Sequence, residues 1–77
     1  MVKVYGKPMC GACKTAKVIL TNEGIEFESI MVTDHEINML LEKGFMALPV
    51  IQINNDFFDG SIPSRVKEAV NKIKEVQ

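Results

Sequence analysis

The spacing of hydrophobic and polar residues changes several times along the chain, and each change predicts a different element. Residues 2–6 place β-branched and aromatic side chains in the alternation of a short strand, which the Gly-Lys-Pro segment at 6–8 ends. Between Gly11 and Glu23, apolar side chains recur at near-helical spacing, and Gly24 suits the left-handed position that ends many helices. The chain is therefore expected to begin with a strand followed by a helix.

The middle of the chain repeats this order. Residues 25–32 alternate and then run apolar, which predicts a second strand whose register the pattern leaves open. Thr33 and Glu36 have the spacing of a capping box, in which each side chain reaches the other residue's backbone amide at a helix start. A second helix is expected from there to about Lys43, ended by Gly44.

A hairpin and a final helix are expected in the last third. Residues 48–53 form an apolar strand with Pro49 at its head, where a missing amide donor does least harm. The asparagines at 54–55 suit a turn into a strand at 56–58, and Pro63 suits the first turn of an amphipathic helix. The apolar stripe of that helix comprises Ile62, Val66, Ala69, Val70, Ile73 and Val76 or Gln77.

The order β-α-β-α-β-β-α predicts an α/β protein with one four-stranded mixed sheet and three helices. A strand-helix-strand crossover makes its two strands parallel, whereas a hairpin makes them antiparallel. The 77 residues fit one domain, residues 1–77, and leave no room for a second.

Overall charge points to no particular partner. Nine basic and ten acidic residues give a net charge of -1, and neither sign forms the long block typical of nucleic-acid or membrane binding. There is no secretory signal pattern and no run of about 18 apolar residues, so a cytoplasmic protein is expected. A monomer is also expected, because no hydrophobic stripe is left over once the core is assigned.

Cys10 and Cys13 carry the chemistry of the chain. Cys10 lies where a strand gives way to a helix, so unpaired backbone amides, the helix dipole and the nearby Lys7 ammonium all favour its thiolate. Cys13 follows one helical turn later, close enough to form a disulfide with Cys10. The pair predicts thiol-disulfide exchange: Cys10 attacks a disulfide, Cys13 resolves the mixed disulfide, and an external reductant resets the bridge. The redox-active disulfide then serves in place of a bound cofactor.

A metal site competes with this interpretation. Zinc takes four protein ligands in a structural site and three in a catalytic one, whereas beyond the two cysteines the only histidine is His35, far along the chain and expected to face solvent. Two inert buried thiols are a weaker alternative, because a C-x-x-C beside a β-α-β pattern is typical of redox proteins.

At this point the sequence resembles the glutaredoxin and thioredoxin superfamily over nearly its full length. Residues 5–13, Tyr-Gly-Lys-Pro-Met-Cys-Gly-Ala-Cys, resemble the glutaredoxin active-site segment, and Leu48-Pro49 matches the cis-proline loop of the superfamily in order and spacing. The resemblance implies the thioredoxin fold in its minimal glutaredoxin-like form. It also implies that Pro49 faces the active disulfide and that the backbone of Leu48 pairs with bound substrate.

Residues 58–64, Phe-Asp-Gly-Ser-Ile-Pro-Ser, resemble NrdH-redoxins more than glutathione-binding glutaredoxins. The latter usually have a Gly-Gly pair, where this chain has Gly60-Ser61. The resemblance implies a protein that reduces protein disulfides, with ribonucleotide reductase as a candidate client and with thioredoxin reductase and NADPH, or else glutathione, as the reductant. The alternatives are a glutathione-dependent glutaredoxin acting on mixed disulfides and a module whose dimer shares an iron-sulfur cluster through Cys10.

The remaining candidate residues surround the cysteines. Met9, Ala47 and Leu48 are expected to form an apolar rim for partner loops, although methionine and leucine also fill cores. Tyr5 is expected to pack in or beside the sheet. Three further methionines, Met31, Met39 and Met46, are expected to serve packing. The expected substrate-binding residues are Met9, Leu48, Pro49, Gly60 and Ser61.

Overall fold

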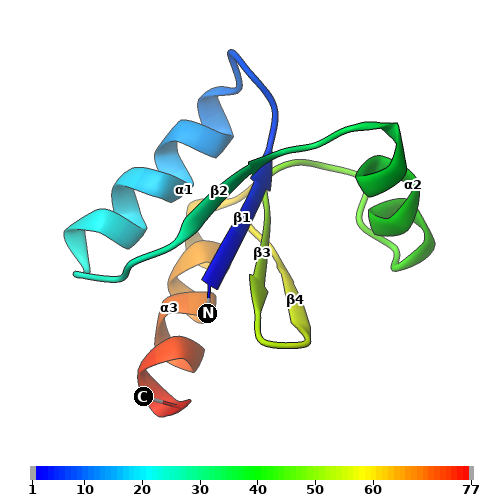
Figure 1. Ribbon diagram of the computed structural model, residues 1–77. Coiled ribbons are helices and arrows are strands. Elements are labelled where there is room, and N and C mark those ends of the chain that lie inside the picture. Colours follow the sequence, from blue (N-terminus) through cyan, green and yellow to red (C-terminus); the bar gives the residue numbers. More distant parts are fainter. Residues whose placement is uncertain (1, 77) are drawn as a thin grey trace.

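A four-stranded sheet forms the centre of the molecule (Figure 1), and the computed structural model describes residues 2–76. The strand order is β2-β1-β3-β4. Strand β1 (Val2–Gly6) pairs in parallel with β2 (Glu28–Met31) and antiparallel with β3 (Val50–Ile53), which pairs antiparallel with β4 (Asp56–Asp59). The predicted mixed sheet is therefore confirmed, including the parallel crossover and the antiparallel hairpin.

Helices cover both faces of this sheet. Helices α1 (Gly11–Asn22) and α3 (Pro63–Val76) lie together on one face, and α2 (Asp34–Glu42) lies on the other (Figure 1). The alternation of β1 makes this possible, because Val4 packs with α1 and α3 while Tyr5 points to the α2 side. The larger core comprises Val2, Val4, Ala16, Leu20, Ile25, Ile51, Ile53, Val66, Ala69, Val70 and Ile73, and the smaller one comprises Tyr5, Leu40 and Val50 with half-buried neighbours.

Strand β2 is shorter than predicted. It begins at Glu28 rather than near Ile25. The amide of Ile25 donates to the Leu20 carbonyl at 3.0 Å and closes the end of α1, with Gly24 at φ 73°. Since this amide bonds the last turn of the helix and the Ile25 side chain is buried in the larger core, Ile25 belongs to the C-terminal cap of α1 rather than to the strand.

The start and end of α2 follow the predicted signals. The Glu36 carboxylate accepts a hydrogen bond from the Thr33 backbone amide at 2.7 Å, and it also accepts one from the Thr33 hydroxyl. The helix ends at Glu42, and Gly44 follows at φ 92°. The predicted capping pair is therefore present, and the predicted glycine ends the helix.

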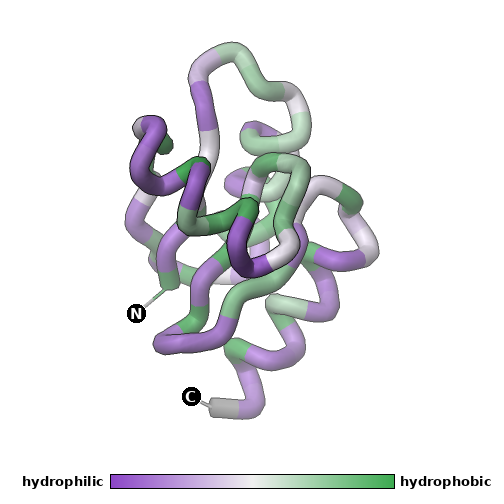
Figure 2. Tube along the Cα trace, turned by 90° about the vertical axis from the view of Figure 1, so that its right-hand side faces the viewer, coloured by the Kyte–Doolittle hydropathy of each residue, from purple (hydrophilic) through white to green (hydrophobic). Residues whose placement is uncertain are grey.

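Helix α3 carries the expected apolar stripe along one side. Figure 2 shows hydrophobic stretches alternating with hydrophilic ones towards the C-terminus. Val66, Ala69, Val70 and Ile73 are buried, but Ile62 is 51% exposed. Its assignment to the buried stripe is wrong, because Ile62 precedes the helix and its carbonyl accepts from the amide of Val66. The last predicted member, Val76 or Gln77, lies outside the side chains that the structure describes.

The helices are modest in length. None within residues 2–76 is long and apolar enough to cross a membrane.

Candidate active site

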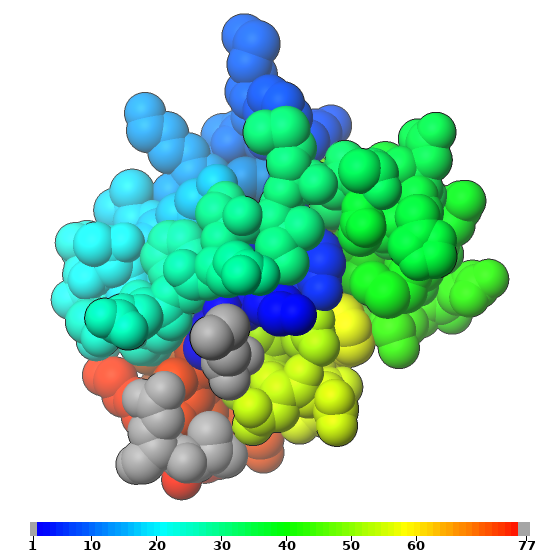
Figure 3. All heavy atoms as spheres, in the orientation of Figure 1, coloured from blue at the N-terminus to red at the C-terminus, as the bar shows by residue number. Residues whose placement is uncertain are grey.

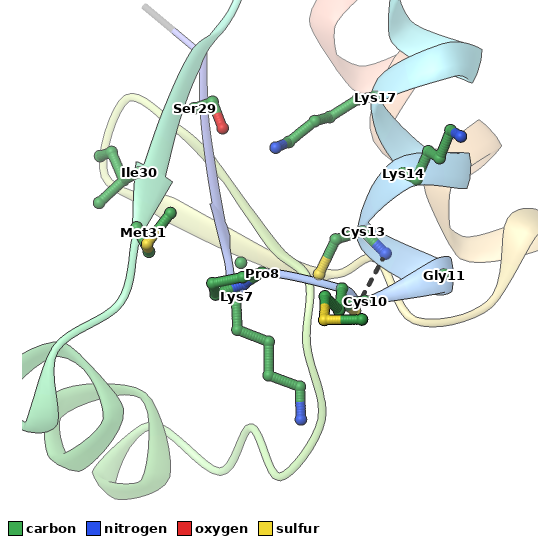
Figure 4. Close-up of a pocket in the computed structure, with 12 residues that line it drawn as sticks. Lys7, Pro8, Cys10, Gly11, Cys13, Lys14, Lys17, Ser29, Ile30 and Met31 are labelled. Atoms are coloured by element: carbon green, nitrogen blue, oxygen red, sulfur yellow. Dashed lines mark hydrogen bonds between the residues drawn. The ribbon is translucent and has the colours of Figure 1, made fainter.

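Cys10 occupies the N-cap position of α1. Its extended backbone, φ -101° and ψ 112°, turns the chain from the loop after β1 into the helix. The backbone amide of Cys13 donates to the Cys10 sulfur at 3.2 Å, drawn as a dashed line in Figure 4. The sulfur therefore receives one of the amides that a helix start leaves without a carbonyl partner.

The two cysteines are free thiols in different surroundings. Cys10 is half-buried, whereas Cys13 is 3% exposed. A hydrogen bond from the Cys13 thiol is the main influence that lowers the pKa of Cys10, and the Cys13 amide and the Lys7 ammonium lower it further. Burial raises the pKa of Cys13, and donation of its thiol hydrogen to Cys10 raises it again. The accessible cysteine thus forms a thiolate more readily, and the buried one is the weaker acid.

Gly6 makes room for the buried thiol. A Cβ at this position would lie 2.9 Å from the Cys13 sulfur and 3.3 Å from the Cys13 Cβ. No real Cβ tolerates the shorter distance without movement of its neighbour, so the close approach of β1 to α1 depends on glycine here. From the sequence, Gly6 was expected only to end a strand, because the contact with Cys13 exists only in the folded chain.

Lys7 and Met9 lie in the exposed loop between β1 and α1. The loop projects from the top of the molecule in Figure 3, drawn in blue. Lys7 is exposed, and Met9 has φ 58° with its side chain fully accessible, at 103% of the reference area. The alternative in which Met9 fills the core is therefore excluded.

Leu48 and Pro49 precede β3 on the α2 side of the sheet. The peptide bond between them is cis. Pro49 is fully buried, and Leu48 is half-buried and packs on the smaller core around Tyr5. Tyr5 itself is buried, as expected, and its hydroxyl donates to the Gln52 side chain at 2.6 Å.

Gly60 and Ser61 follow β4. The Gly60 amide donates to the Pro49 carbonyl at 2.9 Å, and a Cβ on Gly60 would lie 3.1 Å from that oxygen. Ser61 uses both its amide and its hydroxyl as donors to the Asp59 carboxylate, at 2.8 and 2.6 Å. This segment is therefore joined to the proline loop, and the Ser61 hydroxyl already has a partner within the chain.

Two hollows meet at Cys10 and Lys7, which line both. The first, called the lysine cleft here, has a volume of about 570 Å³ and runs between α1 and β2. The second, called the apolar groove, has a volume of about 530 Å³ and runs towards α2. The lysine cleft is lined by Gly6, Lys7, Pro8, Met9, Cys10, Gly11, Cys13, Lys14, Lys17, Ser29, Ile30 and Met31. The apolar groove is lined by Lys7, Cys10, Val32, Ile37, Leu40, Leu41, Phe45, Met46, Ala47 and Leu48.

Several of these lining residues were absent from the sequence prediction. Lys14 and Lys17 follow the cysteines on the same helix, and their position at i+4 from Cys10 and Cys13 was a usable signal. Ser29 comes from β2, and its place opposite α1 follows only from the strand order.

Two predictions about packing are wrong. Met31 and Met46 were expected to serve packing, but they are 65% and 89% exposed. Met31 ends the edge strand β2 and Met46 lies in the loop before β3, so neither is covered by another element. Together with exposed Met9, Ile37 and Leu41, they give an apolar surface around the cysteines. The expectation that no hydrophobic surface is left over is therefore also wrong.

The cysteines have no further candidate metal ligands beside them. Within residues 2–76, no three His, Cys, Asp or Glu side chains are grouped so as to hold a metal ion. His35 is exposed at the start of α2, as expected. The described part of the chain therefore does not supply the three protein ligands of a catalytic zinc site.

Comparison with known proteins agrees with this geometry. A family model described as Glutaredoxin matches residues 2–58. The glutaredoxin-like protein NrdH of Lactococcus lactis subsp. lactis is 35% identical over 68 residues, which cover 86% of this chain and 94% of the relative. The chain belongs to the glutaredoxin family.

Solved structures of glutaredoxin-family proteins have the same fold. The NrdH-redoxin from Escherichia coli, a glutaredoxin-like protein, matches with a TM-score of 0.75 and 26% identity, covering 87% of this chain and 91% of that one. The glutaredoxin of Archaeoglobus fulgidus matches with a TM-score of 0.67 and 27% identity, covering 90% and 84%. The predicted thioredoxin-like fold and the predicted closeness to NrdH are therefore confirmed.

Membership of the glutaredoxin family fixes the reaction class. The chain is a thiol-disulfide oxidoreductase. Proteins of this family generally work without a bound cofactor and exchange electrons with redox partners, and a C-x-x-C pair capable of that exchange is present at the start of α1.

Proposed function

We propose that the chain reduces disulfides of protein clients, with Cys10 as the nucleophile and Cys13 as the resolving thiol. One observation carries the proposal: the accessible Cys10 sulfur accepts the Cys13 amide and thiol hydrogen bonds at the start of α1, while Cys13 itself is buried. This asymmetry supports a first attack by Cys10, because a partner reaches it directly and it has the lower pKa of the two.

The exchange proceeds in two displacements. The Cys10 thiolate attacks one sulfur of the client disulfide, forming a mixed disulfide, and the second client sulfur leaves as a thiolate. Cys13 then loses its proton and attacks the Cys10 sulfur, so that the first client sulfur also leaves as a thiolate. Two electrons pass from the protein dithiol to the client, whose two thiolates take up protons, and a Cys10–Cys13 disulfide remains.

The neighbouring residues have supporting roles in this proposal. Lys7 stabilises the Cys10 thiolate, which is consistent with its effect on the pKa of Cys10. The client segment lies along the apolar groove, pairs with the backbone of Leu48 and passes Pro49, while Met9 contacts it from the exposed loop. Gly60 and Ser61 contact the client beside the proline loop, and the hydrogen bond from the Gly60 amide to Pro49 supports their place next to that loop.

We further propose that thioredoxin reductase with NADPH is the reductant and ribonucleotide reductase the client, in a monomeric cytoplasmic protein. The absence of a Gly-Gly pair at Gly60-Ser61 and the use of the Ser61 hydroxyl by Asp59 disfavour a glutathione pocket. The Escherichia coli relative is described as having a thioredoxin-like activity profile, which supports the same assignment here.

The reductant is tested by measuring insulin reduction in two coupled systems. One contains NADPH and thioredoxin reductase, and the other contains NADPH, glutathione and glutathione reductase, each at matched protein concentration and with reductases from more than one source. We expect at least about tenfold faster turnover with thioredoxin reductase, which corresponds to roughly 1.4 kcal/mol of preference at the transition state. A Cys10→Ser variant gives the background rate of each system.

The two alternative functions predict different outcomes in this assay, together with one further observation each. Preference for glutathione, with activity on glutathione mixed disulfides retained in Cys13→Ser, identifies a glutathione-dependent glutaredoxin. Inactivity in both systems, together with visible absorbance and bound iron after anaerobic purification, identifies an iron-sulfur module.

A further inference from the structure

The lysine cleft has a one-sided charge. Three lysines line it, Lys7, Lys14 and Lys17, and no aspartate or glutamate of residues 2–76 does. The whole chain carries a net charge of -1, so the excess of positive charge along the cleft does not reflect the average composition of the protein. A hollow lined by one sign of charge attracts ligands of the opposite sign.

None of these three lysines forms an ion pair with a carboxylate of residues 2–76. The ion pairs within residues 2–76 are Arg65–Glu68 at 3.2 Å, Lys72–Glu75 at 3.8 Å and Lys74–Glu23 at 2.7 Å, and none of these residues lines the cleft. Lys43 lies over the ring of Phe57. Among the described residues no carboxylate neutralises the lysines beside the cysteines.

Of the three lysines, Lys17 is the one best positioned to contact a ligand inside the cleft. It follows Cys13 by one turn of α1, is half-buried, and extends across the cleft towards Ser29 on β2 (Figure 4). In the same view Lys7 extends downwards, away from Lys17, and Lys14 points away from the cleft interior. A half-buried ammonium gains more from an anionic partner than an exposed one, because solvent screens it less.

We propose that the lysine cleft binds acidic residues that flank the reactive cysteine of a client polypeptide, with Lys17 as the main contact. This inference rests on the proposed function, since it names the class of client that Cys10 reduces. It concerns the Lys17–Ser29 side of the cysteines, whereas the Leu48–Pro49 side belongs to the apolar groove.

The continuity of the two hollows favours a polypeptide as the occupant. Cys10 and Lys7 line both, so a chain segment whose cysteine sits at Cys10 reaches the cleft in one direction and the groove in the other. An extended segment advances about 3.3 Å per residue, so side chains two to four positions from the reactive cysteine are the ones that reach Lys17. The favoured client therefore has acidic residues on one side of its cysteine and apolar residues on the other.

The test compares two synthetic peptides that each contain one intramolecular disulfide. They differ only in whether the positions two to four residues from the cysteines are Asp or the isosteric Asn. Prereduced protein is mixed with each peptide in a single turnover, and each rate is divided by the rate with dithiothreitol alone, which removes the intrinsic reactivity of the peptide. We expect the Asp peptide to react faster at low salt, with the ratio falling towards one as the Debye length shrinks from about 10 Å at 0.1 M to 3 Å at 1 M.

Variants assign the preference to the cleft. Lys17→Gln lowers the Asp-to-Asn ratio by on the order of threefold, the effect of one favourable ion pair near a surface. Lys17→Glu lowers the ratio further. Lys67→Gln is the matched control, because it removes the same charge from an exposed site on α3 and leaves the ratio at the wild-type value.

Three results overturn the inference. They are a wild-type ratio of one, an equal loss of preference in Lys67→Gln, and a ratio in Lys17→Gln that stays at the wild-type value. The uncharged bis(2-hydroxyethyl) disulfide separates this failure from that of the proposed function. If the wild-type protein reduces this small disulfide and reduces both peptides equally well, only the assignment of the cleft fails. If the wild-type protein reduces none of the three substrates, the proposed function fails as well.

Discussion

Two identical side chains three residues apart acquire different chemistry from their surroundings. Cys10 lies at the N-cap of α1, with hydrogen-bond donors directed at its sulfur. Cys13 lies one turn further along α1, where Gly6 of β1 packs against its side chain. The donors lower the pKa of the first thiol, and burial raises the pKa of the second. The division of labour between nucleophile and resolving thiol follows from these positions rather than from residue type.

The hydrogen bond between the two thiols leads to a prediction about pH. Because donation by the Cys13 thiol is the main cause that lowers the pKa of Cys10, Cys13→Ala removes it and the pKa of Cys10 rises. A raised pKa means less thiolate at neutral pH, so the alkylation rate of Cys10 shifts to higher pH. Cys13→Ser, whose hydroxyl still donates, shifts it less. Iodoacetamide alkylation and ultraviolet thiolate absorbance measured across pH report both shifts.

The backbone amide of residue 13 provides an internal control for the comparison of the alanine and serine variants. This amide donates to Cys10 in all three proteins, so some lowering of the pKa of Cys10 remains in Cys13→Ala. Equal pH profiles for the alanine and serine variants would rule out the thiol hydrogen bond as the main cause.

The contact of β1 with α1 places the buried thiol. These elements approach closely where Gly6 faces Cys13, and the Gly6 carbonyl also accepts the Val32 amide at 2.9 Å. The strand is thus held on one side by the sheet and on the other by the helix that carries both cysteines. A residue larger than glycine at position 6 therefore displaces either β1 or α1.

Gly6→Ala tests this packing. The added methyl overpacks the contact with Cys13, so we expect the free energy of unfolding to fall by about 1–3 kcal/mol and the resolving step to slow. Chemical denaturation measures the first effect, and the lifetime of the mixed disulfide measures the second. Gly11→Ala is the matched control, because a Cβ there has open space and alanine favours the helix. Unchanged stability in Gly6→Ala would contradict the close approach.

Secondary structure was predictable wherever the signal is local. The capping pair at Thr33 and Glu36, the terminating glycines and the Asn54 turn depend only on neighbouring residues, and each is present in the structure. The start of β2 was misplaced because Ile25 suits a strand by its side chain, while its amide is used by the preceding helix.

At the scale of the whole molecule, the site is assembled from segments far apart in the sequence. The sequence predicted the cysteines, Lys7 and the proline loop, because each belongs to a recognisable local motif. Two other contacts depend instead on the order of the strands, which brings distant segments together. These are the approach of Lys17 to Ser29 and the hydrogen bond from Gly60 to Pro49. The exposure of Met31 and Met46 likewise depends on what the finished fold leaves uncovered.

The arrangement also explains how a chain of 77 residues offers two surfaces beside one nucleophile. Helices α1 and α3 cover one face of the sheet and α2 covers the other, so the loop that carries Cys10 lies where the two layers end (Figure 1). The lysine cleft opens on the α1 side and the apolar groove on the α2 side.

The central claim, that Cys10 attacks and Cys13 resolves, is tested most directly by trapping the mixed disulfide. Reduced Cys13→Ser is incubated with insulin, the adducts are separated without reductant, and the cross-linked residue is identified by mass spectrometry. We expect a stable adduct through Cys10, absent from Cys10→Ser and only transient in the wild type. A comparable adduct through Cys13 in Cys10→Ser, or no adduct in either variant, would contradict it.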